Sequence, residues 1–91
     1  MSIEWLFDII EDRKKNPTEK SYTATLFADG LPKIAQKVGE EGTEVVVAAL
    51  AQDDQRLIEE IADLTYHALV LLSARGLSPS QVYAELEKRH R

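Results

Sequence analysis

Helix-breaking residues are few in this chain and lie mostly between stretches with helical spacing. The 91 residues include only three prolines and four glycines. Between them, apolar side chains recur at intervals of three and four residues, which is the spacing of one face of an α-helix. Cysteine is absent, so neither a disulfide nor a thiolate metal site can hold the fold together. The sequence therefore predicts a single all-α domain over residues 1–91, a bundle-like arrangement of four to five helices.

Capping residues and breakers set the expected helix limits. Residues 18–30 include β-branched and aromatic side chains typical of a short strand, but a lone strand has nothing to pair with. A loop or a short helical turn is therefore expected in that segment. Four helices are expected elsewhere: one from the cap Ser2 to about Asn16, one from Leu31 to Ala51, one from Gln55 to Arg75 ahead of Gly76, and one after the capping box Ser78-Pro79-Ser80-Gln81.

The third expected helix is too apolar for a small monomer. Residues 61–74 are apolar nearly all round the helix, which indicates burial on most sides. In a bundle of four helices of this length, the other three cannot bury this helix on all sides, and a domain of this size buries only a modest core. The sequence therefore predicts a homodimer or a higher homo-oligomer that completes the bundle.

The charge balance excludes several classes of partner. The chain has 16 acidic and 11 basic residues and a net charge of −5, which disfavours nucleic-acid binding. Charged residues from Glu4 onward leave no secretory signal. The longest apolar stretch, residues 68–74, is far shorter than the roughly 20 residues that span a bilayer. A cytoplasmic protein without a nucleic-acid or membrane partner is expected.

One carboxylate falls where an apolar side chain is expected. On the helix predicted for residues 31–51, Glu41 lies in the middle of the stripe formed by Ile34, Val38, Val45 and Ala48. A carboxylate on a core-facing stripe is costly unless it is paired or coordinates a cation. Glu41 is therefore the first candidate for a functional residue.

Two pairs of acids have the spacing of a metal site. Glu41 and Glu44 on one helix, and Glu60 and Asp63 on the next, are three residues apart and so share a helix face. The short link at residues 52–54 makes these helices antiparallel neighbours. Four facing carboxylates repel one another without a divalent cation, and oxygen ligands suit Mg²⁺, with Mn²⁺ as a substitute. The alternative is a solvated acidic surface. A di-iron centre is not expected, because neither helix has the Glu-x-x-His motif that such centres use.

The acidic pattern resembles the paired Glu-Glu-x-x-Glu and Glu-x-x-Asp motifs of the all-α NTP pyrophosphohydrolase superfamily, at residues 40–44 and 60–63. Within it, the chain is most similar to the phosphoribosyl-ATP pyrophosphohydrolase family of histidine biosynthesis. The similarity covers nearly the whole chain, with Gly42 where alanine is more usual. Four segments carry it: Ser21-Tyr22-Thr23, Lys37-Val38-Gly39-Glu40-Glu41, Ala62-Asp63-Leu64-Thr65-Tyr66-His67 and Leu86-Glu87-Lys88-Arg89-His90.

The resemblance implies Mg²⁺-dependent hydrolysis of phosphoribosyl-ATP to phosphoribosyl-AMP and pyrophosphate by a helical homodimer or larger assembly. Glu40 is the candidate that orients or deprotonates the attacking water, although another carboxylate of the cluster could serve equally well. The hydroxyls of residues 21–23 are assigned to the substrate mainly by the family pattern. The expected metal ligands are Glu41, Glu44, Glu60 and Asp63, and the expected substrate-binding residues are Lys37, Lys33, Ser21, Tyr22 and Thr23.

Two other functions stay open at this point. A house-cleaning pyrophosphatase of the same superfamily would act on free or non-standard nucleotides, but the segments that flank the acidic motifs favour phosphoribosyl-ATP. A non-enzymatic dimerisation module would treat the acids as surface charge. The place of Glu41 on the apolar stripe argues against such a module.

Overall fold

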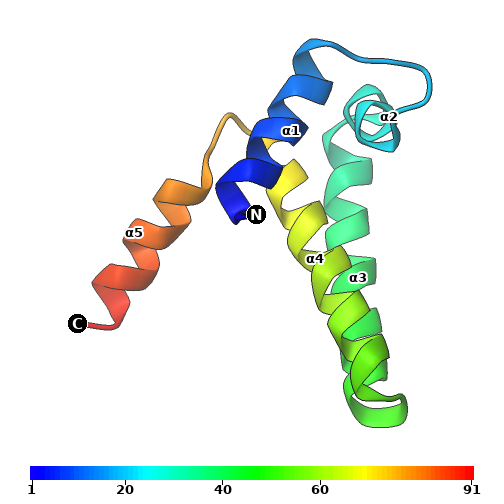
Figure 1. The fold of residues 1–91 in the computed structure, drawn as a ribbon, viewed down its shortest axis with the longest axis vertical. Coiled ribbons are helices and arrows are strands. Elements are labelled where there is room, and N and C mark those ends of the chain that lie inside the picture. Colours follow the sequence, from blue (N-terminus) through cyan, green and yellow to red (C-terminus); the bar gives the residue numbers. More distant parts are fainter.

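The computed structural model describes all 91 residues and consists of α-helices without strands (Figure 1). The all-α class is therefore confirmed. No helix combines the length and the apolar character needed to cross a bilayer. The five helices are α1 (Ile3–Lys15), α2 (Tyr22–Asp29), α3 (Leu31–Ala51), α4 (Asp54–Ala74) and α5 (Pro79–Arg89).

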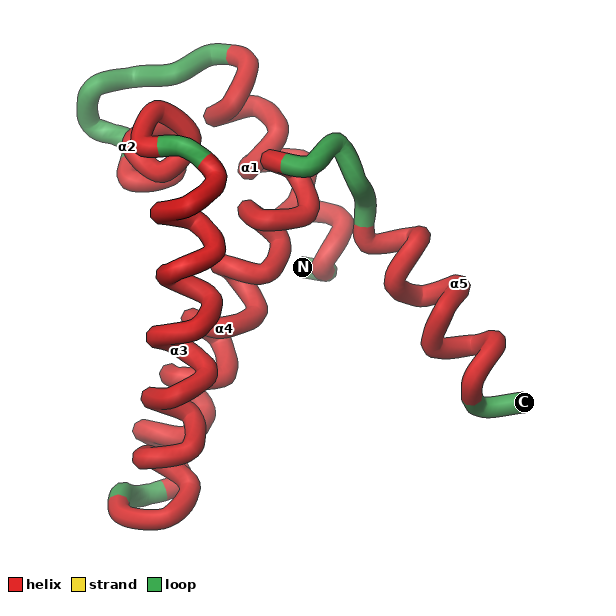
Figure 2. Tube along the Cα trace, turned by 180° about the vertical axis from the view of Figure 1, so that it is seen from behind, coloured by secondary structure: helices red, strands yellow, loops and turns green.

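Helices α3 and α4 form a long antiparallel hairpin that carries the candidate site. They lie side by side along their length in both views (Figures 1 and 2). The carboxylate of Asp53 in the short link accepts a hydrogen bond from the backbone N–H of Arg56 at 2.9 Å, which caps the start of α4. The expected limits of α3 and the expected antiparallel packing are both confirmed.

The segment expected to be a loop or a short helical turn forms the eight-residue helix α2. The Ser21 hydroxyl accepts a hydrogen bond from the backbone N–H of Ala24 at 3.1 Å and so caps the helix. Ala24 and Leu26 are buried. Of the two alternatives the loop is wrong and the helical one is right, because burial against α1 and α3 stabilises a segment whose own helix propensity is modest.

The hydrophobic core lies at one end of the hairpin, where α1 and α2 pack against it. Two hydrogen bonds also join α1 to α4 at the fully buried Ser73. The Ser73 hydroxyl donates to the Glu11 carboxylate at 2.9 Å, and the Lys14 ammonium donates to the Ser73 backbone carbonyl at 2.8 Å. Helices α1 and α2 therefore both pack on this end of the hairpin, α1 against α4 and α2 against α3. The buried core side chains are Ile10, Leu26, Ile34, Leu69 and Val70.

The other end of the hairpin exposes apolar side chains. Helix α4 turns Glu60 and His67 toward the interior, whereas Ile58 and Ile61 are 61% and 46% exposed. On α3, Leu50 is 83% exposed. The first half of α4 thus leaves apolar side chains uncovered in the monomer, whereas Leu69 and Val70 further along the helix are buried in the core.

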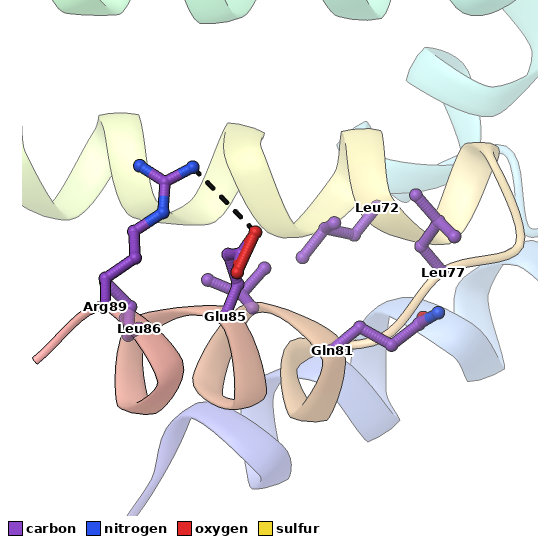
Figure 3. A pocket seen from close by; sticks show the side chains of 7 residues that line it. Leu72, Leu77, Gln81, Glu85, Leu86 and Arg89 are labelled. Carbon is purple, nitrogen blue, oxygen red and sulfur yellow. Dashed lines mark ion pairs between the residues drawn. The ribbon is translucent and has the colours of Figure 1, made fainter. Parts of the chain in front are cut away.

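Helix α5 stands apart from the other helices (Figure 2). It begins at the predicted capping box, in which the Gln81 side chain accepts a hydrogen bond from the backbone N–H of Ser78 at 2.9 Å. Between α5 and the end of α4 lies an open groove of about 420 Å³, lined by apolar side chains that include Leu72, Leu77 and Leu86 (Figure 3). The groove adds to the apolar surface that the monomer leaves uncovered.

Candidate active site

Three carboxylates meet across the hairpin. Glu41 on α3 and Glu60 and Asp63 on α4 each place a carboxylate oxygen within 4.8 Å of the other two. Glu41 and Glu60 are buried, at 6% and 4% exposure, whereas Asp63 is exposed. The antiparallel packing thus brings together three of the four acids that the sequence marks as metal ligands, in a cluster that opens to solvent at Asp63.

Two oxygens of this cluster have no partner in the protein. Oε2 of Glu41 and Oε2 of Glu60 are buried and accept no hydrogen bond. A buried carboxylate oxygen without a partner is costly, and a bound cation removes that cost. Oxygen donors of this kind fit a hard divalent cation such as Mg²⁺ or Mn²⁺.

The other carboxylate oxygen of each buried glutamate forms an ion pair with a basic side chain four residues earlier on the same helix. Lys37 Nζ lies 3.6 Å from Glu41 Oε1, and the Arg56 guanidinium donates to Glu60 Oε1. Because α3 and α4 are antiparallel, Lys37 and Arg56 lie at opposite ends of the carboxylate cluster. Each carboxylate therefore has one oxygen on a fixed positive charge and one oxygen free for a cation.

Glu44 lies beside the carboxylate cluster and is not part of it. Its side chain is exposed, one turn along α3 from Glu41. It lines a polar pocket of about 230 Å³ together with Gln52, Arg56 and Glu60. That Glu44 is a metal ligand stays a prediction: it lies outside the cluster of three acids but shares this pocket with Glu60.

Glu40 is held at the surface next to the cluster. It accepts hydrogen bonds from Gln36 at 2.7 Å and from Lys37 at 3.3 Å. These bonds, that of Gln36 first, hold the pKa of the Glu40 carboxyl below its usual value. Glu40 is thus ionised at neutral pH, which allows it to accept a hydrogen bond from a water.

The hydroxyls of residues 21–23 all make internal hydrogen bonds. The Ser21 hydroxyl caps α2, as described above. The Thr23 hydroxyl pairs with the Tyr66 hydroxyl, and burial raises the pKa of Tyr66. The Tyr22 hydroxyl lies 3.1 Å from Nε2 of His67. These side chains fix the start of α2 on α4, one turn beyond Asp63.

The contacts of His67 define its tautomer. Its Nδ1 lies 2.8 Å from the backbone carbonyl of Asp63. A carbonyl can only accept, so Nδ1 carries a hydrogen; in the neutral ring Nε2 then accepts from the Tyr22 hydroxyl. His67 is buried at 5% exposure, and both of its ring nitrogens are satisfied.

The two lysines differ in their surroundings. Lys37 is half-buried and lies between Glu40 and Glu41, and the hydrogen bond to Glu40 is the main cause of its raised pKa. Lys33, one turn earlier on α3, is exposed and makes no ion pair. Lys37 therefore stays positively charged at neutral pH, and both lysines lie on the side of the cluster nearest α2.

Ser21→Ala is expected to lower thermal stability by removing the cap of α2. The loss of one capping hydrogen bond costs about 1 kcal/mol, which corresponds to roughly 4–8 °C in the melting temperature of a domain this small. Differential scanning calorimetry checks this value, with Ser21→Asp as a matched control that keeps a capping oxygen. Equal melting temperatures for wild type and Ser21→Ala would show that the cap does not stabilise α2.

Sequence reasoning missed Arg56 and left His67 and Tyr66 without a role. The spacing of Arg56 to Glu60 repeats that of Lys37 to Glu41, so the pairing was visible in the sequence as a four-residue interval. The contacts of Tyr66 and His67 reach α2, more than 40 residues earlier in the chain. No local pattern indicates such contacts.

Known proteins are similar in sequence to this chain over nearly its full length. The family described as phosphoribosyl-ATP pyrophosphohydrolase matches residues 4–90. A phosphoribosyl-ATP pyrophosphatase of Clostridium botulinum is 53% identical over 96% of this chain and 79% of its own length. Proteins of the same name from Lacticaseibacillus casei and Sulfurisphaera tokodaii are 53% and 49% identical, over 97% and 96% of this chain and 80% and 93% of their own lengths.

Proposed function

Because the chain belongs to the phosphoribosyl-ATP pyrophosphohydrolase family, we propose that it hydrolyses phosphoribosyl-ATP to phosphoribosyl-AMP and pyrophosphate, with Mg²⁺, in histidine biosynthesis. The observation that carries this proposal is the pair of buried, unpartnered carboxylate oxygens on Glu41 and Glu60, next to Asp63. A cation offsets the negative charge of such buried carboxylates, and it also offsets the negative charge of a polyphosphate substrate.

Glu41, Glu60 and Asp63 would hold the ion, and Glu44 is the fourth candidate ligand from the adjoining pocket. A divalent cation held there would offset charge on the pyrophosphate leaving group and polarise the phosphorus under attack. The hairpin fixes two of these ligands by burial, so little ordering remains when the ion binds.

Glu40 orients the attacking water. Its carboxylate stays ionised because Gln36 and Lys37 donate to it, and an ionised carboxylate can accept a hydrogen bond from water. The proton of that water passes to Glu40 or to another carboxylate of the cluster. Water must approach the α-phosphorus in line with the departing pyrophosphate.

Side chains on the α2 side of the cluster bind the substrate. Lys37 and Lys33 contact phosphate oxygens as point charges. Ser21, Tyr22 and Thr23 line the same side, and their internal hydrogen bonds hold the start of α2 in place. Ser21 and Thr23 keep hydroxyl oxygens that can also accept from the substrate.

The protein assembles as a homodimer or a higher homo-oligomer. Support comes from the exposed apolar side chains on α3 and α4, of which Leu50 and Ile58 are 83% and 61% exposed. A second copy is the natural cover for such a surface, because the monomer has no further helix to place there.

Ile58→Glu is expected to weaken self-association by at least about a hundred-fold, because a charge without a partner in an apolar interface costs several kcal/mol. The folded monomer tolerates the change, since Ile58 is exposed there. Sedimentation equilibrium measures the effect, with Ile58→Val as the apolar control. A wild-type protein that sediments as a monomer would contradict the assembly, and an unaffected Ile58→Glu oligomer would place the interface elsewhere.

Pyrophosphate release from phosphoribosyl-ATP and from ordinary nucleoside triphosphates, with and without Mg²⁺, tests the function. We expect release that requires Mg²⁺ and is specific to phosphoribosyl-ATP. Release mainly from free nucleoside triphosphates would instead assign the chain a house-cleaning role. No release from any of these substrates would favour a dimerisation module.

A further inference from the structure

The carboxylate cluster lies between two ends that differ in chemistry. At the α2 end are Lys37 and the ring cluster formed by Tyr22, Tyr66 and His67. At the end nearest the α3–α4 link, Arg56 lines the polar pocket that it shares with Gln52, Glu44 and Glu60. A substrate that lies along the hairpin with its scissile bond at the cluster places one product toward each end, and the phosphate that stays with the nucleoside lies near Lys37.

The α2 end suits a nucleoside. The rings of Tyr66 and His67 lie edge to face with centroids 4.9 Å apart, and Tyr22, which lies 5.9 Å from His67, is 51% exposed. Aromatic surface of this kind packs well against a base or a sugar. The Tyr22 hydroxyl gives its hydrogen to His67, so its oxygen can only accept from outside. An acceptor matches a ribose hydroxyl and repels a phosphate oxygen.

The Arg56 end suits pyrophosphate. The guanidinium has five N–H donors in a planar fork, of which Glu59 and Glu60 occupy two. The side chain is 46% exposed, so the remaining donors are accessible. Gln52 adds an amide to the same pocket. The acids Glu44 and Glu60 in this pocket repel a bare polyphosphate, so binding at this end requires a divalent cation to offset them.

We propose that phosphoribosyl-ATP lies along the hairpin with its pyrophosphate toward Arg56 and its nucleoside toward Tyr22, so that Arg56 is a pyrophosphate-binding residue. This inference rests on the proposed function and adds the direction of the substrate. In this arrangement the Arg56 side chain contacts only the pyrophosphate product, whereas the Tyr22 side chain contacts only the nucleotide product.

Separate binding of the two products tests this direction. Calorimetry in saturating Mg²⁺ gives the dissociation constants of pyrophosphate and of phosphoribosyl-AMP for wild type, Arg56→Gln and Tyr22→Phe. Arg56→Gln is expected to weaken pyrophosphate binding by about ten-fold or more, the value of a charge-assisted hydrogen bond, and to leave phosphoribosyl-AMP binding unchanged. Tyr22→Phe is expected to weaken phosphoribosyl-AMP binding alone.

Arg13→Gln is the matched control, because Arg13 also pairs with a carboxylate, that of Asp12, but lies on α1 away from the carboxylate cluster. It is expected to change neither constant. The proposal is overturned if Arg56→Gln leaves pyrophosphate binding unchanged, if it weakens both products equally, or if the two variants show the reverse pattern. Failure of the proposed function is a separate result: wild type would then release no pyrophosphate from phosphoribosyl-ATP.

Discussion

Glu41→Gln is expected to reduce Mg²⁺-dependent pyrophosphate release from phosphoribosyl-ATP by about a thousand-fold or more while the helices stay folded. The amide keeps the size of the side chain but loses the negative charge that the ion requires. A bound metal supplies several kcal/mol of transition-state stabilisation, and each 1.4 kcal/mol is a factor of about ten in rate. Steady-state kinetics measure the loss, and circular dichroism checks the fold.

Glu87→Gln is the matched control for this variant. Glu87 is exposed on α5, far along the chain from the carboxylate cluster, and makes no ion pair. It is expected to keep the wild-type rate. An active Glu41→Gln protein would remove Glu41 from the catalytic site and leave its burial as a purely structural feature.

Mg²⁺ is expected to stabilise the folded protein strongly, because the buried oxygens of Glu41 and Glu60 gain a partner only when a cation binds. At a concentration about 100-fold above its dissociation constant, a ligand that binds only the native state adds about 2.7 kcal/mol to the free energy of unfolding. For a domain of this size the melting temperature rises by about 10–20 °C. Thermal scans with Mg²⁺ and with a chelator, at fixed protein concentration, give the difference.

Sodium chloride at matched ionic strength separates specific binding from charge screening, which is expected to shift the melting temperature much less. The Asp63→Asn variant should lose most of the Mg²⁺ effect, since it removes one ligand and keeps the shape of the side chain. Identical scans with Mg²⁺ and with the chelator would contradict a metal site at this cluster.

The sequence predicted the long helices and the acidic site because both follow from short-range spacing. Glu41 was assigned to an apolar stripe at intervals of three and four residues, and it is buried there. The pairing of Glu41 with Glu60 followed from a link too short for anything but an antiparallel hairpin. Caps were equally local, as Ser2 and the capping box at Ser78 show.

Features that depend on distant contacts were not predictable. Helix α2 forms because Ala24 and Leu26 are buried against other helices, and its own residues gave no clear periodic signal. The exposure of Glu44 depends on how α3 rotates against α4, which a helical wheel of one helix cannot show. The contact of Tyr22 with His67 joins residues 45 positions apart.

The ion pairs of Lys37 with Glu41 and of Arg56 with Glu60 affect the order in which the protein folds and binds its ion. Lys37 and Arg56 already offset part of the charge of Glu41 and Glu60 within single helices. The hairpin is therefore expected to form before any metal arrives, unlike small domains that fold only around their ion. Because Asp63 is exposed, an ion is then expected to enter and leave on that side while the chain stays folded, so that metal exchange is not limited by the rate of unfolding.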